Sequence, residues 1–320
     1  MSPTPLDENG VRSLYRELLG REVESTEVMA SHLKGHPTSD SLRESILRSD
    51  EYLAKNPRAD LWRFLSANIV RPAPTIELDP TAEQFDAMFA RIGGQWSSLG
   101  KEDPHWSVIT NDKYRMPNFA AHEGEFYRSG THVASVLRTF AARNAVAIPD
   151  SHVLELGCGT GRVTAALAEM FDHVTAVDVS AGHLDLCREA LSKRGLDNVS
   201  LVQLADPRDV ANLPDCSCFL STIVLQHNPP PLISYLLDWC LAKVQPGGAA
   251  LFQVPTHTPG YEFKITKYLA SPQPKDFEMH CLPMHRVFDL LHRHNFAPKE
   301  VVMDSWTGMP GSHTFFAVKA

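Results

Sequence analysis

The residues best placed for chemistry lie in the segment VLELGCGTGRVTAAL, residues 153–167. A short aliphatic run ends at Leu156, glycines follow at positions 157, 159 and 161, and a helical pattern begins directly after them. Glycines at a strand-to-helix turn let the backbone bend sharply and approach a ligand more closely than any Cβ would allow. The spacing is G-x-G-x-G, whereas a dinucleotide fingerprint needs its third glycine at the position held by Arg162. An NAD-binding domain is therefore the weaker of two alternatives.

Polar residues also end the next strand-like runs. Asp178 ends TAVD, Asp206 follows LVQLA, and Ser221 ends CFLS. A carboxylate at the carboxyl edge of a parallel sheet can accept hydrogen bonds from two ribose hydroxyls, because its two oxygens offer about four lone-pair sites. An Asp after a strand is also a common helix cap. The order of these residues at successive strand ends nevertheless indicates a ligand site.

The glycine segment, preceded by Glu155 on its strand, resembles motif I of class I S-adenosylmethionine-dependent methyltransferases. The resemblance covers residues 151–255 well and the 285–320 tail weakly. It implies S-adenosyl-L-methionine as cofactor, with the glycine loop at its aminoacyl part, Asp178 at the ribose, Asp206 at the adenine amino group and the backbone of Ser221 near the amine. The other residues expected to bind the cofactor are Glu155, Gly157, Cys158, Gly159, Arg162, Val179, Trp106 and Arg128. For Arg128 the expected partner is the cofactor carboxylate, and a surface salt bridge is the alternative.

A general base is expected in the loop STIVLQHNPPP, residues 221–231. Methyl transfer to a hydroxyl needs a group that removes the hydroxyl proton, and an imidazole titrates in a suitable range. His227 is therefore the predicted catalytic residue, although a structural or cofactor-side role is the alternative. The triplet Asn-Pro-Pro at 228–230 is followed by Pro231, not by the aromatic residue of amino-methylating DNA enzymes, so DNA methylation is disfavoured.

Three segments outside the glycine region are expected to shape the acceptor site: WSSLGKEDPHWSVIT, EGEFYRSG and an insertion at about 256–284. They resemble a bacterial group whose genes accompany glycan biosynthesis, which implies O-methylation of a sugar or glycan-like hydroxyl. A small-molecule natural product or lipid-type acceptor is the alternative, and a non-catalytic scaffold or interaction protein is the alternative from another class. Residues expected to bind the acceptor are Tyr127, His280 and His285. No metal site is expected, because a Leu-Pro break separates His280 and Cys281 from His285.

The elements that must position these residues alternate from residue 151 onward. Strand-like runs are HVLEL, HVTAVD, NVSLVQL, CFLSTIVL and AALFQV, and helical stretches are expected at 161–171, 181–194 and 229–244. This alternation predicts an α/β fold with a parallel sheet and helices on both faces. A helix over Met284–His294 and the strands PKEVVM and HTFFAVKA close the chain. The family resemblance implies a Rossmann-like seven-stranded sheet in residues 151–320.

Residues 1–70 are expected to form a helical accessory module. Val11, Leu14, Tyr15, Leu18 and Leu19 form one apolar helical stripe that ends at Gly20, a second helix should follow Ser25, and a third should open with the capping box Ser41-x-x-Glu44 and turn Leu42, Ile46 and Leu53 inward. The module resembles a bacterial helical domain related to phycobilisome linkers, which implies packing, a protein partner or self-association. A stiff proline-rich linker (71–81) and a helical cap or lid region (82–150), with a loop at 95–110, should follow.

Composition limits the function classes. The net charge of -8, from 30 basic and 38 acidic side chains in 320 residues, argues against a nucleic-acid partner. The sequence holds no apolar run long enough to span a membrane and no basic, apolar leader at its start. Its six cysteines form no C-x-x-C pair. We therefore expect a reduced, cytoplasmic protein.

Overall fold

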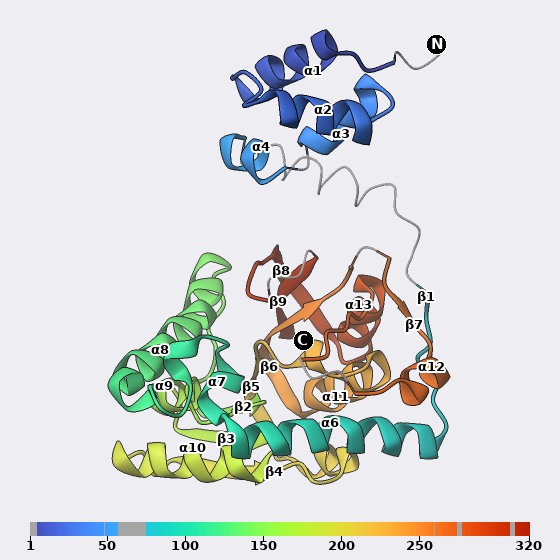
Figure 1. Cartoon of the computed structure of the whole chain (residues 1–320). Helices are drawn as coiled ribbons and strands as arrows, with labels where there is room; N and C mark the ends of the chain where they lie inside the picture. The colour runs from blue at the N-terminus through green and yellow to red at the C-terminus, as the bar shows by residue number, and fades with distance from the viewer. Residues whose placement is uncertain (1–4, 48, 57–74, 259, 274–276, 308–310) are drawn as a thin grey trace. The chain divides into compact units, whose positions relative to one another are not determined.

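The computed structural model describes residues 5–47, 49–56, 75–258, 260–273, 277–307 and 311–320 (Figure 1). Contacts divide the chain into two compact units, residues 1–73 and 74–320.

The first unit is helical. Its helices are α1 (Glu8–Leu14), the π-helical turn η1 (Tyr15–Leu19), α2 (Thr26–Gly35), α3 (Ser39–Leu47) and α4 (Asp50–Lys55). The predicted stripe is confirmed: Val11, Leu14, Tyr15 and Leu19 are buried with Met29, Leu42 and Ile46, and Gly20 ends η1 with φ 65°. The predicted start of the third helix is wrong by three residues, because Thr38 and not Ser41 is the cap: the Thr38 hydroxyl accepts the Ser41 N–H, and the helix begins at Ser39. The side chain of Leu53 lies outside the described residues.

The second unit contains a seven-stranded sheet in the order β4-β3-β2-β5-β6-β9-β8. The strands are β2 (His152–Leu156), β3 (His173–Asp178), β4 (Val199–Gln203), β5 (Cys216–Ser221), β6 (Val244–Pro255), β8 (Phe296–Met303) and β9 (Ser312–Lys319). The pairs from β4 to β6 are parallel, and β9 runs antiparallel to both β6 and β8. The predicted α/β class and seven strands are confirmed. The strand order reverses beside β2, between β3 and β5, which is where open α/β sheets bind ligands.

Helices cover both faces of this sheet (Figure 1). They are α6 (Ala82–Glu102), α7 (Pro104–Val108), α8 (Phe119–Arg143), α9 (Thr164–Ala168), α10 (Ala181–Lys193), α11 (Pro230–Lys243), α12 (Ile265–Ala270) and α13 (Met284–Arg293). Helices α6, α11 and α13 pack into one apolar cluster with the sheet, and α8 and α9 pack into another. Helix α9 is shorter than the predicted 161–171. No helix among the described residues is long and apolar enough to cross a bilayer.

The predicted loop at 95–110 is wrong. Helix α6 continues to Glu102, and α7 begins two residues later. A capping box between Thr81 and Gln84 starts α6, and Met88, Phe89 and Ile92 anchor its apolar face. The pair Gly93-Gly94 has low helix propensity, but this tertiary packing outweighs it.

The second half of the predicted linker is paired with the insertion. Thr75–Ile76 form strand β1, which pairs in parallel with β7 (Glu262–Phe263). The Glu77 carboxylate accepts the N–H of Ile265 at 2.8 Å. Residues 71–74 lie outside the described residues.

Because residues 1–73 bury their own apolar cluster, we expect that their removal leaves the second unit folded. The truncated protein should keep a cooperative thermal transition within about 2–4 °C of the full chain, the shift that about 1 kcal/mol causes in a unit of this size. Calorimetry would measure it. Removing residues 1–81 is the matched control: it deletes β1 and the Thr81 cap, so it should lower Tm further. Insoluble protein from the first truncation would show that the module belongs to the fold of the second unit.

Candidate active site

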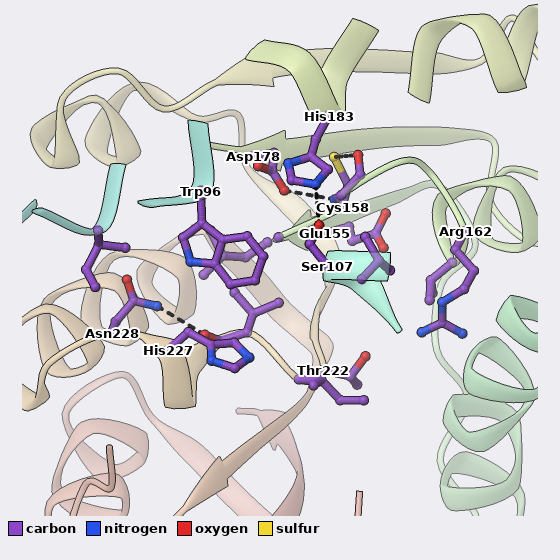
Figure 2. A pocket seen from close by; sticks show the side chains of 18 residues that line it. Trp96, Ser107, Glu155, Cys158, Arg162, Asp178, His183, Thr222, His227 and Asn228 are labelled. Carbon is purple, nitrogen blue, oxygen red and sulfur yellow. Dashed lines mark hydrogen bonds between the residues drawn. The ribbon is translucent and has the colours of Figure 1, made fainter. Parts of the chain in front are cut away.

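A cavity of about 110 Å³ lies at the carboxyl ends of the central strands (Figure 2). The turn after β2 contributes its floor, and the loop after β5 contributes one wall. Helices α6 and α7 contribute Ile92, Trp96, Ser107 and Val108. The remaining lining residues are Glu155, Leu156, Gly157, Cys158, Gly159, Arg162, Val163, Asp178, His183, Thr222, Ile223, Val224, His227 and Asn228. Among these are seven of the residues that the sequence predicted for the site.

The glycine turn has the geometry that its spacing predicts. Gly157 and Gly159 have φ of 79° and 54°, in the left-handed region that side chains disfavour. A Cβ at Gly157 would collide with the side chain of Val224, and one at Gly159 would lie 2.8 Å from Val108. The two glycines therefore allow Val224 of the loop after β5 and Val108 of α7 to pack directly against the turn.

Asp178 holds this turn from the neighbouring strand. Its Oδ2 accepts the N–H of Gly159 at 2.8 Å, and its Oδ1 accepts the N–H of Ser180 at 2.9 Å. Two backbone donors occupy about half of the lone-pair sites of a carboxylate. The remaining sites can accept the hydroxyls of a ligand in the cavity.

Glu155 and Arg162 bring opposite charges to the same cavity. The Glu155 carboxyl is buried and accepts the Thr164 hydroxyl at 2.6 Å; burial raises its pKa to about 7, against the lowering effect of Thr164 and Arg162. Burial also lowers the pKa of Arg162. Its Nη1 donates to the Ser129 hydroxyl at 3.2 Å, and its Nε has no hydrogen-bond partner among the described residues. A buried guanidinium donor of this kind suits a ligand carboxylate.

His227 ends the short turn η4 (Leu225–His227) after β5. Its Nδ1–H donates to the backbone carbonyl of Glu278 at 3.0 Å, and its Nε2 accepts the side-chain amide of Gln226 at 3.2 Å. The ring packs against Trp96 and Phe277, with centroid distances of 5.3 and 5.5 Å. Burial lowers the pKa of His227 to about 4, below the neutral range that the sequence predicted for it. The imidazole is therefore neutral at neutral pH, and its Nε2 carries a lone pair.

Two predicted cofactor residues lie at a neighbouring cavity of about 420 Å³ beneath α6. Val179 and Asp206 line it together with Gly93 and Ser97. A smaller cavity, lined by Asp178, Val179 and Leu204, lies between the two, so the three form a row along the strand ends. Asp206 also caps the turn η3 (Pro207–Asn212), because its Oδ1 accepts the Arg208 N–H at 2.8 Å.

The other predicted site residues line none of these cavities. Arg128 is exposed on α8, and His285 is exposed on α13. Trp106 stacks on Phe277, and the Tyr127 hydroxyl donates to the Thr160 carbonyl beneath the glycine turn at 3.1 Å. The Ser221 hydroxyl donates to the Leu156 carbonyl at 3.1 Å, and His280 pairs with the Tyr261 hydroxyl at 2.8 Å.

The structure adds residues that the sequence analysis missed. His183 donates from Nε2 to the Ser107 hydroxyl at 2.8 Å, and its Nδ1 has no hydrogen-bond partner in the described part of the chain. Thr222 lines the cavity where Ser221 was expected. The sequence could have indicated His183, because it lies in the first turn of the helix that Ser180 caps. Its contact with Ser107 of α7 joins distant residues and could not be predicted from the sequence. Within the described ranges, no group of three His, Cys, Asp or Glu residues is arranged to hold a metal ion.

Comparisons with known proteins agree with this geometry. Residues 153–248 match the family model described as a methyltransferase domain. The ubiquinone biosynthesis O-methyltransferases of Stutzerimonas stutzeri (strain A1501) and Nitrosococcus oceani are 26% and 28% identical to this chain over 136 and 148 residues. These matches cover 42% and 45% of this chain and 57% and 59% of the relatives, so the chain spans less than two thirds of their length.

The fold also matches a solved structure. The magnesium protoporphyrin IX methyltransferase of Synechocystis PCC 6803, with bound SAH, superposes with a TM-score of 0.51 at 18% identity, covering 73% of this chain and 100% of that one. The second unit therefore has the class I methyltransferase fold, and its residues 153–248 match the methyltransferase-domain model.

Proposed function

We propose that this chain is an S-adenosylmethionine-dependent O-methyltransferase that acts on a hydroxyl of a small-molecule acceptor. One observation carries the proposal: a single cavity at the switch point of the sheet is lined by Glu155, Arg162, Asp178 and His227. The intact set of polar residues also favours an enzyme over a non-catalytic scaffold with the same fold.

The residues of the cavity fit the proposed cofactor. Its methionyl end carries an ammonium and a carboxylate, which match the Glu155 carboxyl and the unpartnered Nε of Arg162. Asp178 has lone pairs left for ribose hydroxyls, and the row of cavities leads from there to Val179 and Asp206. When bound, the cofactor supplies an electrophilic methyl group on a sulfonium. Arg162 takes the carboxylate-binding role that the sequence assigned to Arg128.

The chain's own residues would then prepare the acceptor. His227 would accept the hydroxyl proton at Nε2, which is unprotonated because Nδ1 carries the hydrogen that binds the Glu278 carbonyl. The acceptor hydroxyl would take the place that the Gln226 amide occupies on this lone pair. Trp96 and Phe277 exclude water from one side of the ring, which favours proton transfer between positioned groups.

Aromatic side chains favour a flat, apolar acceptor. Trp96, Phe277 and Trp106 form a row next to His227, with Trp96–Phe277 and Phe277–Trp106 centroid distances of 5.6 Å each. The relatives' names refer to ubiquinone biosynthesis. The sugar or glycan-like hydroxyl predicted from the sequence has no support in the comparisons. We therefore propose the alternative, a small-molecule or lipid-type acceptor.

The test is methyl transfer from isotope-labelled S-adenosylmethionine to a panel of phenols, catechols and free or lipid-linked sugars, followed by mass spectrometry. We expect a labelled methyl ether on a phenol or catechol. A product on the sugars alone would overturn the acceptor proposal and restore the glycan hypothesis. Cofactor binding without turnover on any acceptor would favour the scaffold alternative.

Cofactor binding is expected to depend on pH through Glu155. The cofactor's positive charge favours the ionised carboxylate, so binding should lower a pKa that burial holds near 7 and should release a proton. Arg162 and Thr164 also face this group and favour its ionised form, whereas Asp178 opposes it. Affinity should rise by up to about tenfold per pH unit below pH 7 and level off above it.

Calorimetry at pH 6.5 in buffers of different ionisation enthalpy would measure the released proton. In Glu155→Gln the binding enthalpy should no longer depend on the buffer. A buffer-independent enthalpy in the wild-type protein would contradict this linkage.

The proposed methyl transfer assigns no role to residues 1–70. We propose that they act as an interaction module, through a protein partner or self-association, because they bury a separate apolar cluster. Comparing the mass of the full chain and the 74–320 protein by light scattering tests the self-association.

A further inference from the structure

Residues 277–280 of the insertion at 256–284 contact the predicted base: the Phe277 ring packs against it, and residues 278–280 supply backbone hydrogen bonds. The Glu278 carbonyl accepts the Nδ1–H of His227 at 3.0 Å. Two residues later, the N–H of His280 donates to the carbonyl of Gln226 at 2.7 Å. The segment therefore binds both the ring of His227 and the backbone just before it.

The Glu278 carboxylate forms hydrogen bonds with three other side chains. Arg91 of α6 donates its Nε to Oε1 at 2.8 Å, and the Tyr268 hydroxyl of α12 donates to Oε2 at 2.5 Å. His280 lies 3.4 Å from Oε2, and Tyr261 holds the other nitrogen of that imidazole at 2.8 Å. The side chains of Arg91 and Glu278 are only 12% and 4% exposed, so this ion pair is largely removed from solvent.

Arg91 extends the anchor to the rest of the insertion. Its Nη1 donates to the carbonyls of Tyr268 at 3.0 Å and Ser271 at 2.8 Å, and its guanidinium lies 4.3 Å from the Tyr268 ring centroid. Although burial would raise the pKa of Glu278, the hydrogen bonds from His280, Tyr268 and Arg91 lower it, so the carboxyl is ionised. A buried charged pair is costly to desolvate, and a specific structural role is one reason to retain it.

We infer that Glu278 is a positioning residue: its anchored backbone carbonyl holds His227 as the Nδ1–H tautomer with the Nε2 lone pair directed to the acceptor. A carbonyl oxygen can only accept, so the ring nitrogen that faces it must carry the hydrogen. Arg91 and Tyr268 act through Glu278, and they thereby connect α6 and α12 to the site. This inference rests on the proposed function for its catalytic consequence, but the tautomer exists without any ligand.

The test uses the full chain with Glu278→Gln, which keeps the size of the side chain and removes its charge. ¹⁵N NMR of labelled histidine in the ligand-free protein, with the His227 signal assigned from a His227→Gln spectrum, reports the tautomer. Wild type should show Nδ1–H alone, and the variant should show a mixture. The kcat for methyl transfer should fall by about 10- to 100-fold, part of the 10²–10⁴-fold effect of a positioned base, with cofactor Kd within about twofold.

Glu262→Gln is the matched control, because Glu262 lies on β7 of the same insertion with its side chain 46% exposed and forms a surface ion pair with Lys264. It should change neither the tautomer nor kcat. Tyr268→Phe removes one hydrogen bond without removing a charge, so it should shift the tautomer in the same direction by less. It also serves as the test if Glu278→Gln does not fold.

An unchanged His227 tautomer in folded Glu278→Gln and Tyr268→Phe would overturn the inference, whatever happens to kcat. A changed tautomer with unchanged kcat would support the positioning contact and show instead that His227 is not the base. The two failures are therefore distinguishable.

Discussion

Asp178→Ala is expected to weaken the binding of S-adenosylmethionine by about 2–4 kcal/mol, or roughly 30- to 800-fold. Two losses contribute. The carboxylate that would hold the ribose hydroxyls is removed, and hydrogen bonds to a charged group are each worth about 1.5–3 kcal/mol without adding fully. The N–H of Gly159 also loses its acceptor, so the glycine turn is no longer held against β3.

Titration calorimetry of the purified protein would measure this loss. Asp185→Ala on α10 is the matched control, because the Asp185 side chain is 68% exposed and forms a surface ion pair with Arg188. Asp178→Asn separates the two contributions, since it keeps an oxygen for Gly159 but loses the charge. Wild-type affinity in Asp178→Ala would exclude the ribose assignment.

The parts of the fold that the sequence predicts well are those in which local pattern and tertiary packing agree. Strands β2 and β3 are almost entirely buried, so they are largely apolar runs in the sequence, and each has a carboxylate at or next to its last residue, Glu155 or Asp178, that lines the cavity. The last eight residues of helix α6, 95–102, were predicted as part of a loop, and this stretch is largely polar. The stability of the helix comes from long-range packing of Phe89 and Ile92 against the sheet, which no local window contains.

In the candidate site, too, the residues of a local motif were predicted and those that depend on distant contacts were not. Glu155, Gly157 and Arg162 belong to one contiguous motif, so their positions followed once the strand and turn were recognised. Arg128 was predicted to bind the cofactor carboxylate, but the sequence does not show which face of α8 carries it. In the structure Arg128 is exposed. The Glu278 contact joins residues 51 positions apart through a backbone carbonyl, which carries no side-chain signal in the sequence.

His227→Ala is expected to lower kcat by about 10²–10⁴-fold, the usual contribution of a positioned general base, with little change in cofactor Kd. Burial lowers the pKa of His227 to about 4, so the neutral, base-competent form persists well below the ordinary histidine pKa of about 6.5. In the wild-type protein kcat should therefore stay level as the pH falls from 7 and should decline only as the imidazole gains its proton near pH 4. The variant should lack this decline.

Fixed-time assays of the methylated product between pH 4 and 8 would measure both the loss of kcat in the variant and the pH dependence of kcat in the wild type. Circular dichroism must confirm the fold at each pH. His285→Ala is the control, because His285 is exposed on α13 and does not line the cavity. If His227→Ala keeps its kcat and raises only the cofactor Kd, the imidazole belongs to the cofactor pocket. In that case the acceptor hydroxyl must be acidic enough to react without a base, or it must lose its proton to another group at the cavity, such as His183, whose Nδ1 has no partner among the described residues.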